Sequence, residues 1–133
     1  MSRYGMQVRI EAPMAEAMAR TRVALADQGF GVLTEIDVAA TLKAKLGVDV
    51  PAQVILGACN PALAHRALEI EPDLGLLLPC NVVVRQDGST GTLVSAVDPD
   101  MLVQVSDRSD LAPVAAEARA RLEQALSAAA RDT

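Results

Sequence analysis

Two matching dipeptides hold the residues of this sequence that are best suited to chemistry. Cys59-Asn60 comes just before Pro61, and Cys80-Asn81 opens a run of valines. Each cysteine adjoins an apolar segment of strand length, so each thiol is predicted to lie at a strand end beside a carboxamide that can donate and accept hydrogen bonds. If the two strands are neighbours, the two dipeptides approach each other and form one ligand site.

Cys59 could also be an activated thiol. Asn60-Pro61 is typical of the N-cap and first residue of a helix, and the positive end of a helix dipole lowers the pKa of a nearby thiol and can hold an anion. This gives an alternative function, a thiol-based redox protein in which Cys80 is the resolving partner. A metal site formed by Cys59, Cys80 and His65 is a further alternative.

Other observations weigh against both alternatives. The cysteine spacing matches neither Cys-x-x-Cys nor a paired zinc-binding pattern, and a free cysteine is often only a small buried apolar residue. His65 falls on the far side of its helix from Leu63 and Ala67, with Glu69 four residues on, which predicts a solvated pair. The sequence therefore assigns no catalytic residue, metal or cofactor, and leaves open whether the protein is an enzyme.

Three carboxylates are predicted at strand ends. Asp37 is explained as a helix N-cap, and Asp98 by the turn that an Asp-Pro pair forms. Glu35 has no such structural explanation, so it joins the candidate site. The candidate ligand-binding residues are Glu35, Cys59, Asn60, Cys80 and Asn81.

Hydrophobic periodicity predicts the elements that must position these residues. Alternating or short apolar runs predict strands over 4–11, 30–36, 53–58, 80–86 and 92–97, the last two joined as a hairpin. Amphipathic spacing and end signals predict helices over 13–28, 38–46, 61–70 and about 111–129, with a short helical segment after Asp98-Pro99. The alanine-rich tail after Ser127 is expected to fray. The order indicates an α+β fold, with a largely antiparallel sheet and a long final helix packed on one face.

Composition bounds the function further. The chain has 133 residues, 51% apolar and 2% aromatic, with a net charge of −5, which favours one domain spanning 1–133. Scattered basic residues and few aromatics argue against nucleic-acid binding. No apolar run is long enough to span a membrane and no signal peptide is evident. We therefore expect a cytoplasmic protein with free thiols, no nucleic-acid partner and no membrane.

Four segments of the sequence resemble the bacterial domain of unknown function 302 family. They are 29–37 with 41–43, 55–61 with 64–65, 71–72 with 75–84, and Asp98-Pro99 with the long C-terminal helix. The resemblance implies a TATA-binding-protein-like fold, a curved antiparallel sheet carrying one long helix and additional short helices, and it implies a homodimer. DNA binding does not follow from the fold. The family has no settled activity, so it supplies no catalytic residues.

Together these observations predict a small, homodimeric binding or accessory protein. Its ligand would be a small molecule of unknown identity, held where the two Cys-Asn dipeptides meet. The alternative is a thiol-based redox or metal-binding protein that uses Cys59 and Cys80.

Overall fold

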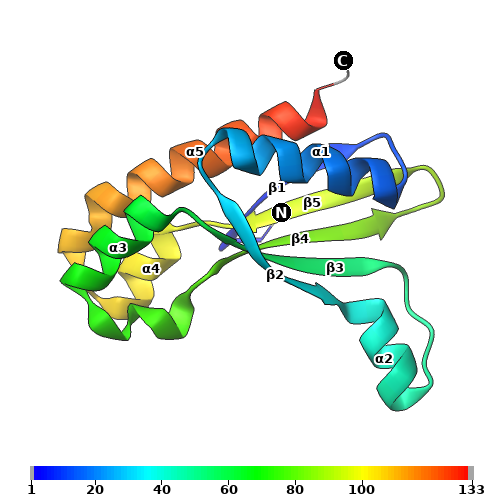
Figure 1. Ribbon diagram of the computed structural model, residues 1–133, viewed down its shortest axis with the longest axis horizontal. Helices are drawn as coiled ribbons and strands as arrows, with labels where there is room; N and C mark the ends of the chain where they lie inside the picture. The colour runs from blue at the N-terminus through cyan, green and yellow to red at the C-terminus, as the bar shows by residue number, and fades with distance from the viewer. Residues whose placement is uncertain (1, 132–133) are drawn as a thin grey trace.

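A five-stranded antiparallel sheet forms the centre of the computed structural model, which describes residues 2–131 (Figure 1). The strand order is β1-β5-β4-β3-β2. The strands are β1 Gly5–Ile10, β2 Gly31–Asp37, β3 Gln53–Cys59, β4 Cys80–Asp87 and β5 Gly91–Val97. The helices are α1 Met14–Asp27, α2 Val38–Leu46, α3 Pro61–Ile70, α4 Asp100–Ser106 and α5 Ala112–Ala130, with 3-10 helices η1 Pro72–Leu77 and η2 Ser109–Leu111. The predicted α+β class is confirmed.

The structure also corrects two expectations about element ends. The final helix runs to Ala130 rather than fraying after Ser127, because Ala129 is packed into the core with 2% of its surface exposed. Pro72 ends α3 as predicted, but it also begins η1, which the sequence pattern did not indicate. Both differences arise from packing between distant elements, which local propensity does not record.

Helices α2 and α3 begin at capping residues that are visible in the sequence. Asp37 caps α2 by accepting a hydrogen bond from the N–H of Ala40 at 2.9 Å, and Gly47 ends the helix in the left-handed region at φ 70°. Asn60 caps α3 in the same way, accepting from the N–H of Leu63 at 3.3 Å. The chain therefore turns sharply from β3 into α3 directly after Cys59.

Two hydrophobic clusters divide the interior. The first lies between the sheet and the helices α1 and α5, and includes Leu25, Leu56, Val84 and Leu122. The second lies at one end of the sheet among α3, η1, η2 and the first half of α5, and includes Leu63, Leu74, Leu111 and Val114. Helix α5 spans both clusters, so it fixes how the end of the sheet faces α3.

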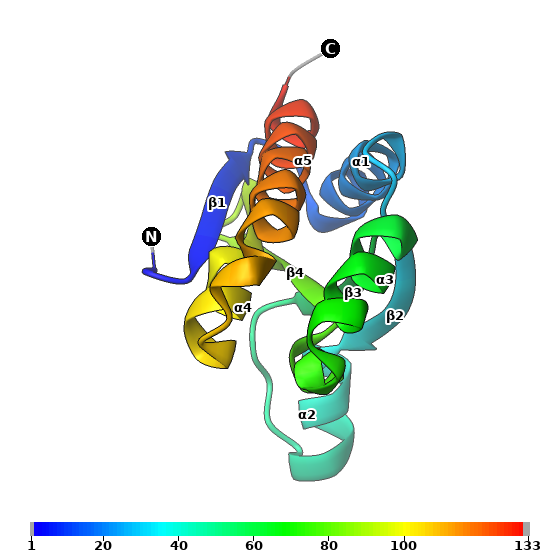
Figure 2. The same cartoon turned by 90° about the vertical axis from the view of Figure 1, so that its left-hand side faces the viewer.

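Helices α1 and α5 cover only one face of the sheet, as Figure 2 shows. On the opposite face, α2 projects away from the sheet beyond its β2–β3 side (Figures 1 and 2). All nine residues of α2 are described and none is buried. Between residues 2 and 131, no helix combines the length and hydropathy that a membrane crossing requires.

Candidate functional site

A cavity of about 240 Å³ lies between the end of the sheet and the helices α3, α4 and α5. It separates the two hydrophobic clusters, taking part of its wall from each. The apolar side chains along it include Phe30, Leu63, Leu78, Leu102, Val114 and Ala118. This volume is many times that needed for one water, and slightly below the ~300–1,000 Å³ typical of small-molecule sites.

The wall of the cavity is composed almost entirely of carbon and sulfur. Cys59 and Cys80 both border it, and Asn60 is the one polar side chain among the described residues that line it. No charged residue between positions 2 and 131 takes part in the lining. A cavity of this kind favours neutral apolar molecules, because a charged group would lose its hydration without gaining a partner.

The register of β3 and β4 places the two cysteines on adjacent strands, and both border the cavity. Cys80 is paired directly with Ala58, so Cys59 is the next residue along the facing strand. Both cysteines are free, Cys80 buried and Cys59 partly exposed. Burial, with a smaller effect from the negative charge of an ionised Cys59, raises the pKa of the Cys80 thiol from 9.0 to about 11. Cys80 is therefore a neutral thiol at physiological pH.

Asn60 lies in the same wall, but its amide is engaged in fixing the backbone. Its Oδ1 accepts from the N–H of Leu63, and its Nδ2 donates to the carbonyl of Gln28 at 3.4 Å. The second hydrogen bond ties the β3–α3 turn to the end of α1. Asn60 thus holds the edge of the cavity in place.

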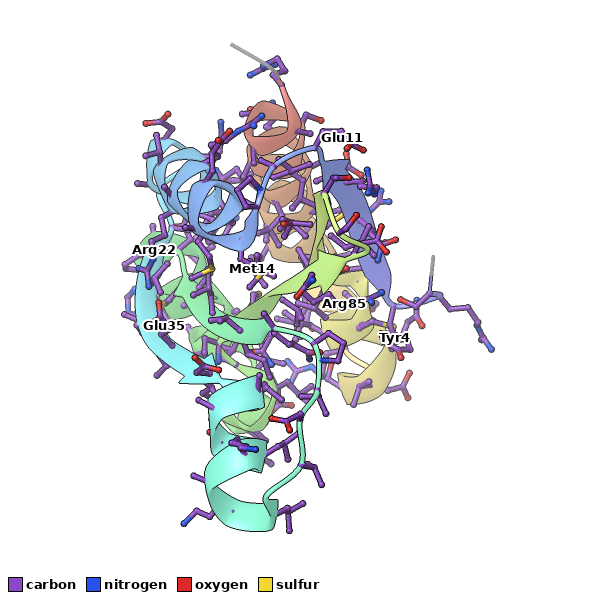
Figure 3. All side chains as sticks on the ribbon, turned by 90° about the vertical axis from the view of Figure 1, so that its right-hand side faces the viewer. Tyr4, Glu11, Met14, Arg22, Glu35 and Arg85 are labelled. Carbon is purple, nitrogen blue, oxygen red and sulfur yellow. The ribbon has the colours of Figure 1, made fainter. Side chains whose placement is uncertain are left out.

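Two of the five sequence-predicted residues lie away from the cavity. Glu35 is exposed at the β2 edge and forms an ion pair with Arg22 of α1; Figure 3 shows the two side chains beside each other. Asn81 is exposed on the uncovered face of the sheet. It points there because Cys80 points into the interior and consecutive strand residues face opposite sides.

His65, the third ligand of the alternative metal site, is on the surface of α3. Its Nδ1 lies 3.6 Å from the Glu69 carboxylate, and both side chains are exposed. Within the described residues, no group of three or more His, Cys, Asp or Glu side chains could hold a metal ion. His65 therefore does not share a site with the cysteines.

Sequence reasoning did not identify the residues that enclose the cavity. Phe30, Leu102, Val114 and Ala118 come from three separate parts of the chain, the last two from α5. Their apolar character predicts burial. It does not show that the space between them is unfilled, because that depends on how α4 and α5 pack against the sheet.

The fold and the cavity define a class of protein: an α+β domain with an antiparallel sheet, helices on one face, and an apolar cavity at one sheet end. The sequence profile of the domain of unknown function DUF302 matches residues 6–129. The chain belongs to this family.

A solved structure agrees with this assignment. The crystal structure of an uncharacterised conserved DUF302 protein from Bacillus stearothermophilus is similar at a TM-score of 0.89 and 34% sequence identity, covering 98% of this chain and 100% of the other. No curated protein matches the chain.

Proposed function

We propose that this protein is a homodimeric binding protein that holds a small, neutral, apolar molecule in the cavity beside Cys59 and Cys80. The observation that supports this function is the composition of the wall: a space of about 240 Å³ bordered by apolar side chains, two thiols and one carboxamide that is already hydrogen-bonded. An apolar cavity of ~150 Å³ in another protein stays dry and binds benzene. A somewhat larger cavity suits a ligand of the size of a substituted benzene.

Toluene is a suitable probe, and benzoate is its charged counterpart. We expect toluene to raise the melting temperature of the protein in a concentration-dependent way, because a ligand that binds only the folded state stabilises it. Benzoate should have no such effect, because no charged side chain among residues 2–131 borders the cavity. Isothermal titration calorimetry with both probes provides an independent measurement.

A matched pair of variants on α3 tests the location. Ala64 borders the cavity and is partly buried, whereas Ala62, two residues earlier, is exposed and does not border it. Ala64→Phe should fill the space and abolish toluene binding, while Ala62→Phe should leave it unchanged. If toluene binds equally well to both variants, or if benzoate binds as tightly as toluene, the proposal is wrong.

The pair of thiols supports a second candidate function, the reduction of a small disulfide. Cys59 and Cys80 lie on adjacent strands and border the same cavity. In this reaction Cys59 attacks the substrate disulfide, one thiol product leaves, and Cys80 displaces the second. The two protein thiols lose two electrons and two protons and become a Cys59–Cys80 disulfide. The substrate disulfide gains these two electrons and two protons and becomes two thiols.

Oxidised glutathione tests this candidate. If the reaction occurs, the intact mass should fall by two hydrogens, and Cys80→Ser should instead trap a glutathione adduct on Cys59. Elemental analysis of the protein purified without added metal tests the related possibility that the two thiols bind a soft metal ion such as Cu(I). An unchanged mass and the absence of bound metal would leave apolar binding as the function of the cavity.

A further inference from the structure

The arm, residues 38–52, consists of α2 and the segment that follows it. Several of its apolar side chains are exposed. Leu46 is 70% exposed, and Val48 and Val50 are also exposed. The arm projects from the sheet on the side away from α1 and α5 (Figures 1 and 2). A nine-residue helix is marginal in water unless one of its faces is packed. The arm therefore needs a surface to pack against.

The uncovered face of the sheet provides one part of such a surface. Ile36, Ile55 and Val83 are directly paired across β2, β3 and β4, forming an apolar row beside the arm. None of the three belongs to either hydrophobic cluster. Arg85 points to the same face, since its neighbour Val84 is buried in the first cluster. The row is thus available for contact with another chain.

A hollow at the opposite end of the molecule provides the other part. It has a volume of about 260 Å³ and lies between η1 and α4, with Leu76, Leu77 and Val105 on its surface. Leu76 is 87% exposed and Val105 is 60% exposed. Segment η1 also forms one wall of the ligand cavity through Gly75. A partner seated in the hollow would therefore rest on the wall of the ligand site.

The charges of the arm and the hollow are complementary. The sequence contains only two lysines, Lys43 and Lys45, and both are on the arm. Lys43 pairs with Asp49 at 3.1 Å, while Lys45 forms no ion pair within residues 2–131. Asp73 borders the hollow and Asp107 follows α4; both are exposed, and neither forms an ion pair in the described chain. A basic apolar arm and an acidic apolar hollow thus occur on one chain.

We infer that the partner on this surface is a second copy of the chain, with the arm of each copy seated in the η1–α4 hollow of the other. The arm and the elements η1 and α4, which border the hollow, lie at opposite ends of the sheet (Figure 1). A twofold rotation that seats each arm in the other copy's hollow closes the assembly at two chains. With the uncovered sheet faces turned toward each other, this arrangement also covers both apolar rows. Asn81, on the same face, then lies in the interface. This inference rests on the homodimer of the proposed function and specifies its contact surface.

Light scattering on exposed-residue variants tests the interface. We expect the unmodified protein to have twice the 13.9 kDa mass of one chain. Val48→Asp on the arm and Ile36→Asp on the apolar row should each reduce the mass to that of one chain. Val23→Asp is the matched control, because Val23 is 63% exposed on α1, on the helix-covered side. It should leave the dimer intact, and circular dichroism should show all three variants folded.

A charge exchange tests which end the arm reaches. Lys45→Glu should raise the dimer dissociation constant about tenfold or more, because it places two acids together. Adding Asp73→Lys should restore most of the affinity if Lys45 faces the hollow of the other copy. A failure of this restoration would overturn the placement of the arm.

The outcomes separate this inference from the proposed function. A dimer that persists in both Val48→Asp and Ile36→Asp would overturn the interface and leave the homodimer in place. A monomeric unmodified protein would overturn both the interface and the homodimer, while toluene binding would still test the cavity. Loss of the dimer in Val23→Asp as well would show that any added charge disrupts it, and would also overturn the specific surface.

Discussion

Cys59 is one residue beyond the direct strand partner of Cys80, and both thiols border the same cavity. Two thiols therefore border a wall in which Asn60 is the one other polar side chain among the described residues. Their surroundings differ, because Cys80 points into the interior from β4, whereas Cys59 is partly exposed where β3 ends. The two thiols are therefore expected to differ in ionisation and in their reactivity toward thiol reagents.

Ionisation of Cys80 should make stability fall at alkaline pH. Its pKa is raised from 9.0 to about 11, so the folded protein keeps the proton that the unfolded chain begins to release near pH 9. The free energy of unfolding should drop as the pH rises from about 9 to 11 and then level off. Two pKa units correspond to roughly 2–3 kcal/mol. Urea unfolding across this pH range, compared with Cys80→Ala, isolates the effect, and equal pH slopes in the two proteins would refute it.

Thiol labelling should proceed in two separate phases. At pH 8 in the native protein, one equivalent of a thiol reagent should react readily, at Cys59, and the second only after unfolding, because Cys80 is buried and protonated. Cys59→Ala should remove the fast phase, and Cys80→Ala should remove the slow one. Two fast phases in the native protein would show that Cys80 is accessible. If neither thiol reacts in the native protein, neither cysteine borders an open cavity.

Much of this arrangement could be predicted because it depends on local patterns. The Asn60-Pro61 cap and the two apolar runs predict the cysteines at strand ends, and the adjacent strands β3 and β4 place both of them on the border of one cavity. The same pattern could have excluded Asn81. If Cys80 faces inward on a strand, the next residue must face the other side of the sheet.

The remaining parts of the site depend on contacts between distant elements. The sequence indicates no structural role for Glu35 because its partner, Arg22, is on α1, and no periodicity pairs the two residues. The cavity itself lies where α5 crosses from one hydrophobic cluster to the other. An apolar stripe predicts that Val114 is buried, but it does not distinguish a filled contact from an open one.

Removing the cap of α3 should loosen the edge of the cavity. Asn60→Ala deletes both the acceptor for the Leu63 N–H and the donor to the Gln28 carbonyl, and should cost about 0.5–2 kcal/mol of unfolding free energy. Asn60→Asp keeps the acceptor and should lose less. Urea unfolding of the three proteins measures the difference. Equal stability of Asn60→Ala and the unmodified protein would mean that neither hydrogen bond supports the fold.

Gly57 should resist substitution because its neighbours already fill the space beside it. A Cβ atom at this position would overlap the Oγ1 atom of Thr34 and lie 2.9 Å from Cγ of Pro79. Gly57→Ala should therefore cost about 1–3 kcal/mol of unfolding free energy, even though alanine normally suits a strand better than glycine.

The control for this steric effect is Gly75→Ala, because a Cβ atom at Gly75 has no heavy atom within 4 Å among the described residues. It should leave the stability nearly unchanged. Thr34→Ala combined with Gly57→Ala should recover part of the loss, since it removes the closer of the two neighbours. If the double variant is as unstable as Gly57→Ala alone, the contact with Pro79 rather than the contact with Thr34 causes the loss of stability. The β3–β4 strand ends around the thiols are then packed more tightly than the Thr34 contact alone implies.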